Sequence, residues 1–179
     1  SLLRPLEAAV RAGRPLLIVA EGVKGEALRT LTLNKIKNNL RVVAGKGPKF
    51  GDRRRDTLED VALLTGGKLV SDRRGDSLKV IDPETLGSAK RIILTQHKTT
   101  IIGGMWRTSA IEKRANGIRA MQSLENNTPF QEKTLRERLA KLTGGVAIIR
   151  VGGASEAELK ERKDRADDAV NALRAAANG

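Results

Sequence analysis

The chain has 179 residues, 39% of them apolar, and its 34 lysines and arginines against 21 acidic residues give a formal net charge of +13. It contains no cysteine, which excludes disulfides and cysteine-based metal sites or nucleophiles, and its single histidine leaves no zinc site of the usual His/Cys kind. For that reason we expect no metal site. The apolar runs are far too short to span a bilayer, so we expect no membrane contact either.

The positive charge points to RNA or another polyanion as one class of partner. The basic residues are, however, spread along the chain, and the only aromatic residues are Phe50, Trp106 and Phe130. Proteins that bind single-stranded nucleic acid usually stack its bases on aromatic side chains, so this composition disfavours a nucleic-acid partner. A basic RNA- or polyanion-binding module stays open as the alternative function.

The first half of the chain alternates between helix and strand. A helix is expected over Leu2–Val10, where apolar residues fall on one arc of a helical wheel, and Gly13 supplies its stop. The apolar run Leu16–Ala20 predicts a buried strand. A second helix is expected over about Gly25–Lys37, and Arg41–Ala44 predicts the next strand.

The second half continues the mixture. A loop is expected over 45–51, and Asp52 is expected to cap a helix that continues to Leu64. Strands are then predicted over 68–71, 90–95 and 99–102, and helices over 109–124 and 129–142. Because strands and helices mix throughout, the fold class is α/β.

Two glycine pairs flank a predicted strand near the C-terminus, Gly144-Gly145 and Gly152-Gly153. Adjacent glycines admit unusual dihedrals, so they can mark a hinge, and the first pair is the best candidate for a domain boundary. Two tight turns without motion would produce the same pattern. After the second pair, Ser155 and Glu158 form a predicted capping box for a charged last helix.

The second predicted helix has an apolar arc that covers well over half of its wheel. Leu28, Thr32 and Ile36 form one line, with Leu31 and Leu33 on either side. A surface helix that packs on one core usually shows a narrower stripe. Two explanations are open: the helix is buried on two sides, or it leaves apolar side chains exposed as a protein-binding surface.

Two runs carry a family resemblance, PLLIVAEGVKGEAL at 15–28 and GGVAIIRVGGASE at 144–156. Both resemble motifs of the bacterial-type (group I, GroEL-type) chaperonins, with the two glycine pairs in register. The resemblance covers essentially the whole chain and weakens over 103–134, as in a divergent paralogue. It implies an apical-domain-like fold, with sheets flanked by helices, followed by a helical segment of the intermediate domain.

In that family two parallel helices form a groove that binds non-native polypeptide and, alternately, the mobile loop of a co-chaperonin. By position, the resemblance places this site at Leu3 and Leu6 on the first helix and at Leu28, Thr32, Leu33 and Asn34 on the second. Aliphatic side chains suit this task, because their non-directional affinity binds unfolded chains without reading their sequence. Thr32 stands where the family usually has an apolar residue, which should weaken the groove modestly.

The run GPKFGDRR at 47–54 resembles a turn that precedes a helix in the same family. It lacks the spacing of a phosphate-binding loop. Lys49 stands where the family usually has glycine, so the backbone dihedrals of this turn are an open question.

The resemblance makes Asp168, on the last helix, the counterpart of an aspartate that supports ATP hydrolysis with Mg in a separate equatorial domain. Without that context, an isolated aspartate on a polar helix face is most often a solvated surface charge. The phosphate-binding motif of the equatorial domain does not occur in this sequence. We therefore expect no cofactor in this fragment and no ATPase activity of its own, with ATP and Mg bound only in the intact protein.

Together these features lead us to expect an apical, polypeptide-binding domain over 1–145 and the C-terminal half of an intermediate domain over 146–179. Both ends read as cut from a longer protein. The resemblance implies a sevenfold double ring for the intact protein, whereas the fragment should be a monomer or a weak oligomer. It also implies a cytoplasmic location, or an organelle matrix or stroma in a eukaryote.

Overall fold

The computed structural model of the chain describes residues 2–77, 83–95, 98–145 and 149–178. The chain divides into two compact units, Ser1–Gly144 (unit 1) and Gly145–Gly179 (unit 2). The division falls between the glycines of the first predicted hinge pair. The α/β class is confirmed, because helices and two small sheets alternate along the described chain. The assignment of the two units to apical and intermediate domains stays a prediction.

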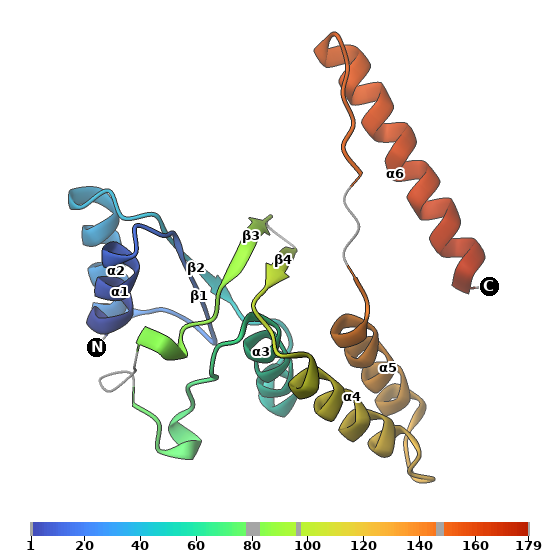
Figure 1. The fold of residues 1–179 in the computed structure, drawn as a ribbon, viewed down its shortest axis with the longest axis horizontal. Helices are drawn as coiled ribbons and strands as arrows, with labels where there is room; N and C mark the ends of the chain where they lie inside the picture. Colours follow the sequence, from blue (N-terminus) through green and yellow to red (C-terminus); the bar gives the residue numbers. More distant parts are fainter. Residues whose placement is uncertain (1, 78–82, 96–97, 146–148, 179) are drawn as a thin grey trace. The chain divides into compact units, whose positions relative to one another are not determined.

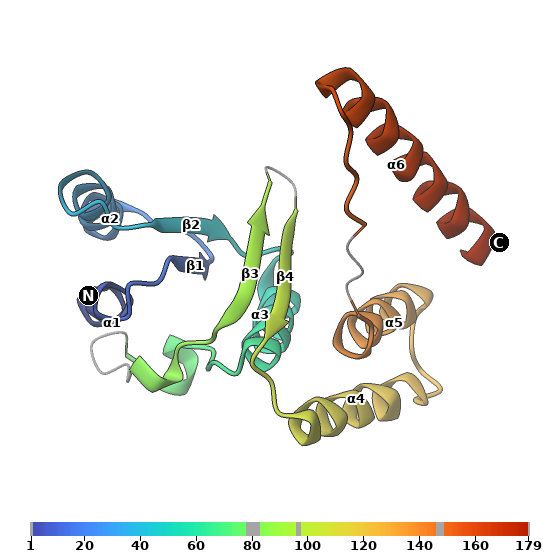
Figure 2. The same cartoon turned by 45° about the horizontal axis from the view of Figure 1, so that its top comes forward.

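Unit 1 begins with a helix and a β-α-β unit: α1 (Leu3–Arg11), β1 (Leu16–Ala20), α2 (Gly25–Lys37) and β2 (Val42–Lys46). The two strands pair in parallel, with Leu16 opposite Val42. A parallel pair needs a crossover connection, and α2 supplies it. Helices α1 and α2 lie side by side at one end of unit 1 (Figure 1 and Figure 2).

The core of this first part joins both helices to the sheet. Its buried members are Leu6, Leu31, Leu40 and Val42, with Leu2, Leu16, Ile18 and Val23 packed around them. Leu6 comes from α1 and Leu31 from α2, so these two side chains fix the helices to each other and to β2. The expected helix over Leu2–Val10 and the expected strand over Leu16–Ala20 are confirmed, although the strand is half-buried along its length and not buried as predicted.

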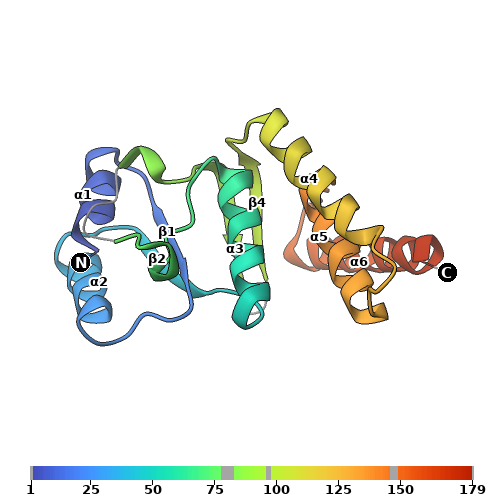
Figure 3. The same ribbon diagram turned by 90° about the horizontal axis from the view of Figure 1, so that it is seen from below.

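The rest of unit 1 contains α3 (Gly51–Thr65), η1 (Asp72–Arg74), η3 (Pro83–Thr85), β3 (Ala89–Leu94), β4 (Thr99–Gly104), α4 (Thr108–Gln122) and α5 (Pro129–Thr143). Strands β3 and β4 form an antiparallel hairpin. Helix α3 runs beside the hairpin, and α4 and α5 lie alongside each other (Figure 3). Ile111, Ile118 and Leu142 form the buried core between these helices.

The end of α3 meets the end of β4 at a contact that only glycine permits. Gly66 ends α3 with φ 72°, in the left-handed region, and a Cβ at this position would lie 2.1 Å from the carbonyl oxygen of Met105. Likewise, a Cβ at Gly104 would lie 2.0 Å from the carbonyl oxygen of Leu64. We call this contact of Gly66 and Gly104 with the neighbouring backbone the glycine junction. Trp106, which is half-exposed, follows it directly.

The strand predicted over 68–71 is wrong, and the side chain of Asp76 explains why. The backbone amide of Ser71 donates to a carboxylate oxygen of Asp76 at 3.2 Å, and the carbonyl of Ser71 accepts from the amides of Arg74 and Asp76. These local bonds turn the chain into η1. The amide and carbonyl of Ser71 are therefore already occupied and cannot pair with a neighbouring strand.

Asp76 also gives this segment a pH dependence. The hydrogen bond from Lys68 and then the one from the Ser71 amide hold the pKa of Asp76 below the ordinary range of an aspartate. A lowered pKa stabilises the fold at pH values above the unfolded pKa, about 3.9, and that contribution is lost as pH falls through the folded value. We expect an NMR titration to find the Asp76 carboxyl titrating below the ordinary aspartate value, about 3.9, with Ser71 amide exchange accelerating over the same pH range. A carboxyl that titrates at or above the ordinary value contradicts this prediction.

The start of α3 differs from the expected cap. Phe50, not Asp52, is the N-cap, and no side chain accepts a capping hydrogen bond there. Lys49 adopts φ 65°, so it takes the left-handed conformation that glycine adopts without strain. Phe50 is exposed, with the Lys46 ammonium 5.7 Å and the Arg54 guanidinium 5.0 Å from its ring centroid.

Unit 2 is built on one long helix, α6 (Glu156–Asn178). Its predicted capping box is half confirmed: the Glu158 amide donates to the Ser155 hydroxyl at 3.2 Å, but the Glu158 carboxylate accepts from the amide of Ala154 instead of that of Ser155. Half of the strand predicted between the glycine pairs, 146–148, lies outside the described residues, and the other half, 149–151, is not in a strand. None of the helices in the described part is both long and apolar enough to cross a membrane.

Candidate functional site

Helices α1 and α2 expose five large aliphatic side chains, which we call the α1–α2 face. On α1, Leu3 and Val10 are 54% and 56% exposed; on α2, Leu28, Leu33 and Ile36 are 50%, 53% and 75% exposed. Single exposed leucines are ordinary on protein surfaces, but clusters on adjacent elements mark binding sites. In the α1–β1–α2–β2 part of unit 1, these two helices carry all but one of the described large apolar side chains that are exposed; the other is Val43.

The face follows from the way each helix packs. Leu6 and Leu31 are only 3% and 5% exposed, because they point into the core shared with β2. Leu3 and Val10 are seven residues apart and therefore share a side of α1. Leu28 and Ile36, eight residues apart, lie along one line of α2, away from Leu31. The wide apolar arc of α2 is thus explained by one buried edge and one exposed edge.

The predicted groove residues fall into three environments: the exposed α1–α2 face, the buried core, and polar positions whose side chains are hydrogen-bonded within α2. Leu3, Leu28 and Leu33 lie on the α1–α2 face, whereas Leu6 belongs to the core and offers almost no accessible surface, so its assignment to the groove is not supported. Thr32 is exposed, and its hydroxyl donates to the Leu28 carbonyl at 2.9 Å.

Asn34 is half-buried, and its amide nitrogen donates to the carbonyl of Thr30 at 2.8 Å. The hydroxyl of Thr32 and the amide of Asn34 already donate hydrogen bonds to carbonyls of α2. A partner that covers the helix would therefore leave neither donor without an acceptor.

A sequence model of the TCP-1/cpn60 chaperonin family matches residues 1–179, the whole length of the chain. The chain belongs to the TCP-1/cpn60 chaperonin family. The resemblance noted from the sequence is therefore confirmed at the level of the family. Membership gives this chaperonin chain a role in protein folding, with binding of non-native polypeptides and assembly into rings as general properties of the family.

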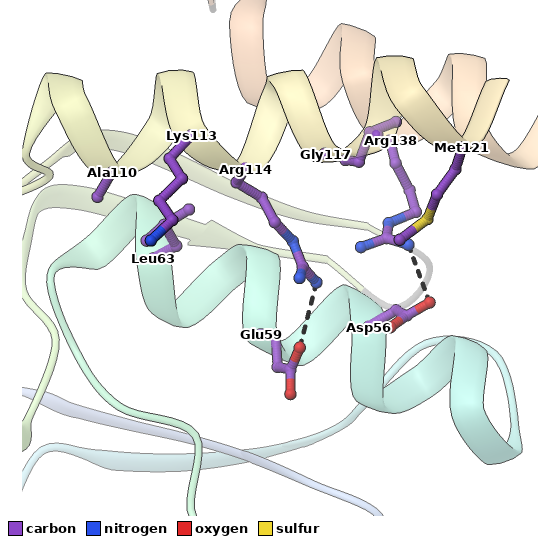
Figure 4. Close-up of a pocket in the computed structure, with 10 residues that line it drawn as sticks. Asp56, Glu59, Leu63, Ala110, Lys113, Arg114, Gly117, Met121 and Arg138 are labelled. Carbon is purple, nitrogen blue, oxygen red and sulfur yellow. Dashed lines mark hydrogen bonds and ion pairs between the residues drawn. The ribbon is translucent and has the colours of Figure 1, made fainter. Parts of the chain in front are cut away.

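A group of paired arginines and carboxylates lies between α3, α4 and α5. Arg138 donates to both oxygens of Asp60, from Nε at 2.8 Å and from Nη2 at 3.1 Å, and its Nη1 donates to Asp56 at 2.9 Å. Arg114 donates to Asp60 at 3.0 Å and to Glu59 at 3.1 Å. We call these five residues the ionic cluster; Figure 4 draws four of them around a pocket of about 500 Å³.

The arginines and carboxylates of the ionic cluster stabilise one another's charges in the interior of unit 1. Burial alone would lower the pKa of Arg138, but the hydrogen bonds that it donates to Asp60 and the charges of Asp60, Asp56 and Glu59 outweigh burial and raise that pKa. Arg138 is thus held as a cation beside the Asp60 carboxylate in the interior. The carboxylates that line this pocket, Asp56 and Glu59, are therefore already paired with arginines.

The predicted hinge glycines and Asp168 are placed as follows. The described glycines with positive φ do not include Gly144, Gly145, Gly152 or Gly153. Close approach constrains two of them: a Cβ at Gly144 would lie 2.4 Å from the Ala140 carbonyl oxygen, and one at Gly153 would lie 2.7 Å from the Leu159 nitrogen. Asp168 is exposed on α6.

Sequence reasoning did not include Val10 and Ile36 in the site. Both had a signal: Val10 shares the apolar arc of α1 with Leu3, and Ile36 continues the line of Leu28. The ionic cluster had none, because its partners are far apart in sequence. Within the residues that the structure describes, no group of three or more His, Asp or Glu side chains could hold a metal ion.

Proposed function

We propose that this chaperonin chain binds non-native polypeptides through the α1–α2 face. The observation that carries the proposal is the exposure of five aliphatic side chains, each half or more accessible, on two helices whose buried edges hold them in place. Unfolded chains expose apolar side chains that folded proteins bury. Burial of both sets against each other is favourable in proportion to area and needs no sequence match.

The finer features of the family are part of the same proposal. The mobile loop of a co-chaperonin would compete for the α1–α2 face. In the intact protein, ATP and Mg would be held by a domain outside this chain, with Asp168 at that site, and the glycine pairs would transmit the ATP-driven motion. The intact protein would form a sevenfold double ring in the cytoplasm, or in the matrix or stroma of an organelle.

The test is serine substitution on the face. Leu28→Ser and Leu33→Ser should each weaken binding of a urea-unfolded protein diluted into buffer by roughly tenfold or more, because burial of one leucine is worth about 1.5–3 kcal/mol. Their melting temperatures should stay close to that of the parent chain. Binding is measured by fluorescence anisotropy of the labelled unfolded protein, and melting by calorimetry.

Two further variants serve as controls, one for an exposed leucine outside the face and one for a buried leucine of α2. Leu124→Ser makes the same change at another exposed leucine, just after α4, and should leave binding unchanged. Leu31→Ser alters the buried edge of α2 and should lower the melting temperature. If Leu28→Ser melts as low as Leu31→Ser, or if Leu124→Ser weakens binding equally, the proposal is wrong.

A further inference from the structure

The α1–α2 face is interleaved with positive charge. On α2, Arg29 precedes Leu33 by four residues and Ile36 by seven, and Lys35 follows Leu28 by seven, so each cation shares a side of the helix with exposed aliphatic side chains. Arg29 and Lys35 are themselves exposed. A polypeptide covering the aliphatic side chains would therefore also meet these cations.

The basic residues of the two helices outnumber their acidic residues. Helices α1 and α2 contain five basic residues, Arg4, Arg11, Arg29, Lys35 and Lys37, against two acidic ones, Glu7 and Glu26, which leaves a net charge of +3. Among the described residues, none of these five forms an ion pair. The nine ion pairs described within unit 1 lie outside α1 and α2.

Charge and composition also weigh against two other occupants. A second copy of this chain would bring its own basic face against the first, and like charges would oppose the contact. A nucleic acid would find no aromatic side chain on either helix on which to stack, since the first aromatic residue of the chain is Phe50. An acidic polypeptide with exposed aliphatic residues matches both properties of the face.

We propose that the α1–α2 face selects acidic segments of non-native polypeptides, in which Asp or Glu residues are interspersed with aliphatic ones. This inference rests on the proposed function and specifies its substrate class. The aliphatic side chains supply the affinity. The cations Arg29 and Lys35 set the preference, because complementary charge discriminates between partners and speeds their encounter.

The test uses two unstructured peptides with the same leucine and valine positions, one with glutamate and one with lysine at every intervening charged site. At low salt, about 0.02 M, the glutamate peptide should bind the whole chain roughly tenfold more tightly, as two or three exposed ion pairs of up to about 1 kcal/mol each imply. At about 0.5 M salt, where exposed charges are screened, the preference should shrink severalfold while both peptides still bind.

Matched variants locate the preference. The double variant Arg29→Gln/Lys35→Gln should lose most of the preference and keep its affinity for the lysine peptide. Lys160→Gln/Lys163→Gln removes the same charge from exposed positions of α6 and should keep the preference intact. If the α6 variant loses it equally, the preference reflects the net charge of +13 and the inference is wrong.

The remaining outcomes separate the two proposals. Equal binding of the two peptides overturns the acidic preference and leaves the polypeptide-binding function standing. If neither peptide binds, both proposals fall. A single-stranded oligonucleotide that displaces the glutamate peptide from the face, and binds more tightly than it does, would assign the face to nucleic acid and overturn the inference.

Discussion

Asp60→Ala is expected to destabilise unit 1 by about 3–5 kcal/mol, the usual cost of breaking a buried ion pair from one side. Asp60 is only 7% exposed and accepts two hydrogen bonds from Arg138 and one from Arg114. Without this carboxylate, the guanidinium of Arg138 would remain buried, and Asp56 would be its one remaining hydrogen-bond partner among the residues that the structure describes. The loss is measured by guanidinium unfolding of the parent chain and the variant.

Asp56→Ala is the matched control, because it removes a carboxylate from the same arginine. Asp56 is far more accessible than Asp60, and surface pairs contribute about 0–1 kcal/mol. The double variant Asp60→Leu/Arg138→Leu should recover most of the lost stability, since apolar residues of similar volume often replace a buried pair without penalty. Equal losses for Asp60→Ala and Asp56→Ala would mean that burial does not determine the strength of the ionic cluster.

The second large effect is expected at the glycine junction. Gly66→Ala should cost about 1–2 kcal/mol for placing a side chain in the left-handed region. It should cost a further 1–3 kcal/mol because the new Cβ, 2.1 Å from the Met105 carbonyl oxygen, forces the end of α3 away from β4. The expected total is about 2–5 kcal/mol, measured by guanidinium unfolding.

Gly75→Ala isolates the conformational part of that cost. Gly75 ends η1 with φ 73°, nearly the same angle as Gly66, but a Cβ there would meet no atom within 4 Å. Its loss should therefore stay near 1–2 kcal/mol. If Gly66→Ala costs no more than Gly75→Ala, the close approach at the glycine junction is not a constraint on the fold.

The elements that could be predicted from the sequence are those with local signals. Helix α2 has the bounds expected from its apolar period, Gly25–Lys37, and β3 and β4 lie within two residues of their predicted limits. The strand predicted over 68–71 failed because a side chain five residues away, Asp76, captured the amide of Ser71. A competition of that kind leaves no trace in hydrophobic periodicity.

The sequence predicted which two helices form the candidate binding face, but it predicted only some of the residues that are exposed on them. Leu3 and Leu6 occupy the same short helix and both read as groove residues, yet one is half-exposed and the other is core. The difference depends on where β2 and Leu31 lie, which is tertiary information. The ionic cluster could not be predicted from the sequence at all, because Asp60 lies 54 residues from Arg114 and 78 from Arg138.

Trp106 gives unit 1 an optical signal of its own. It is the only tryptophan, and the chain has no tyrosine, so indole emission comes from unit 1 alone, next to the glycine junction. Far-ultraviolet circular dichroism, in contrast, sums the helices of both units, including the 23 residues of α6. Denaturation curves recorded by the two methods should therefore separate wherever α6 melts independently, and they should coincide if the glycine pairs leave both units in one cooperative transition.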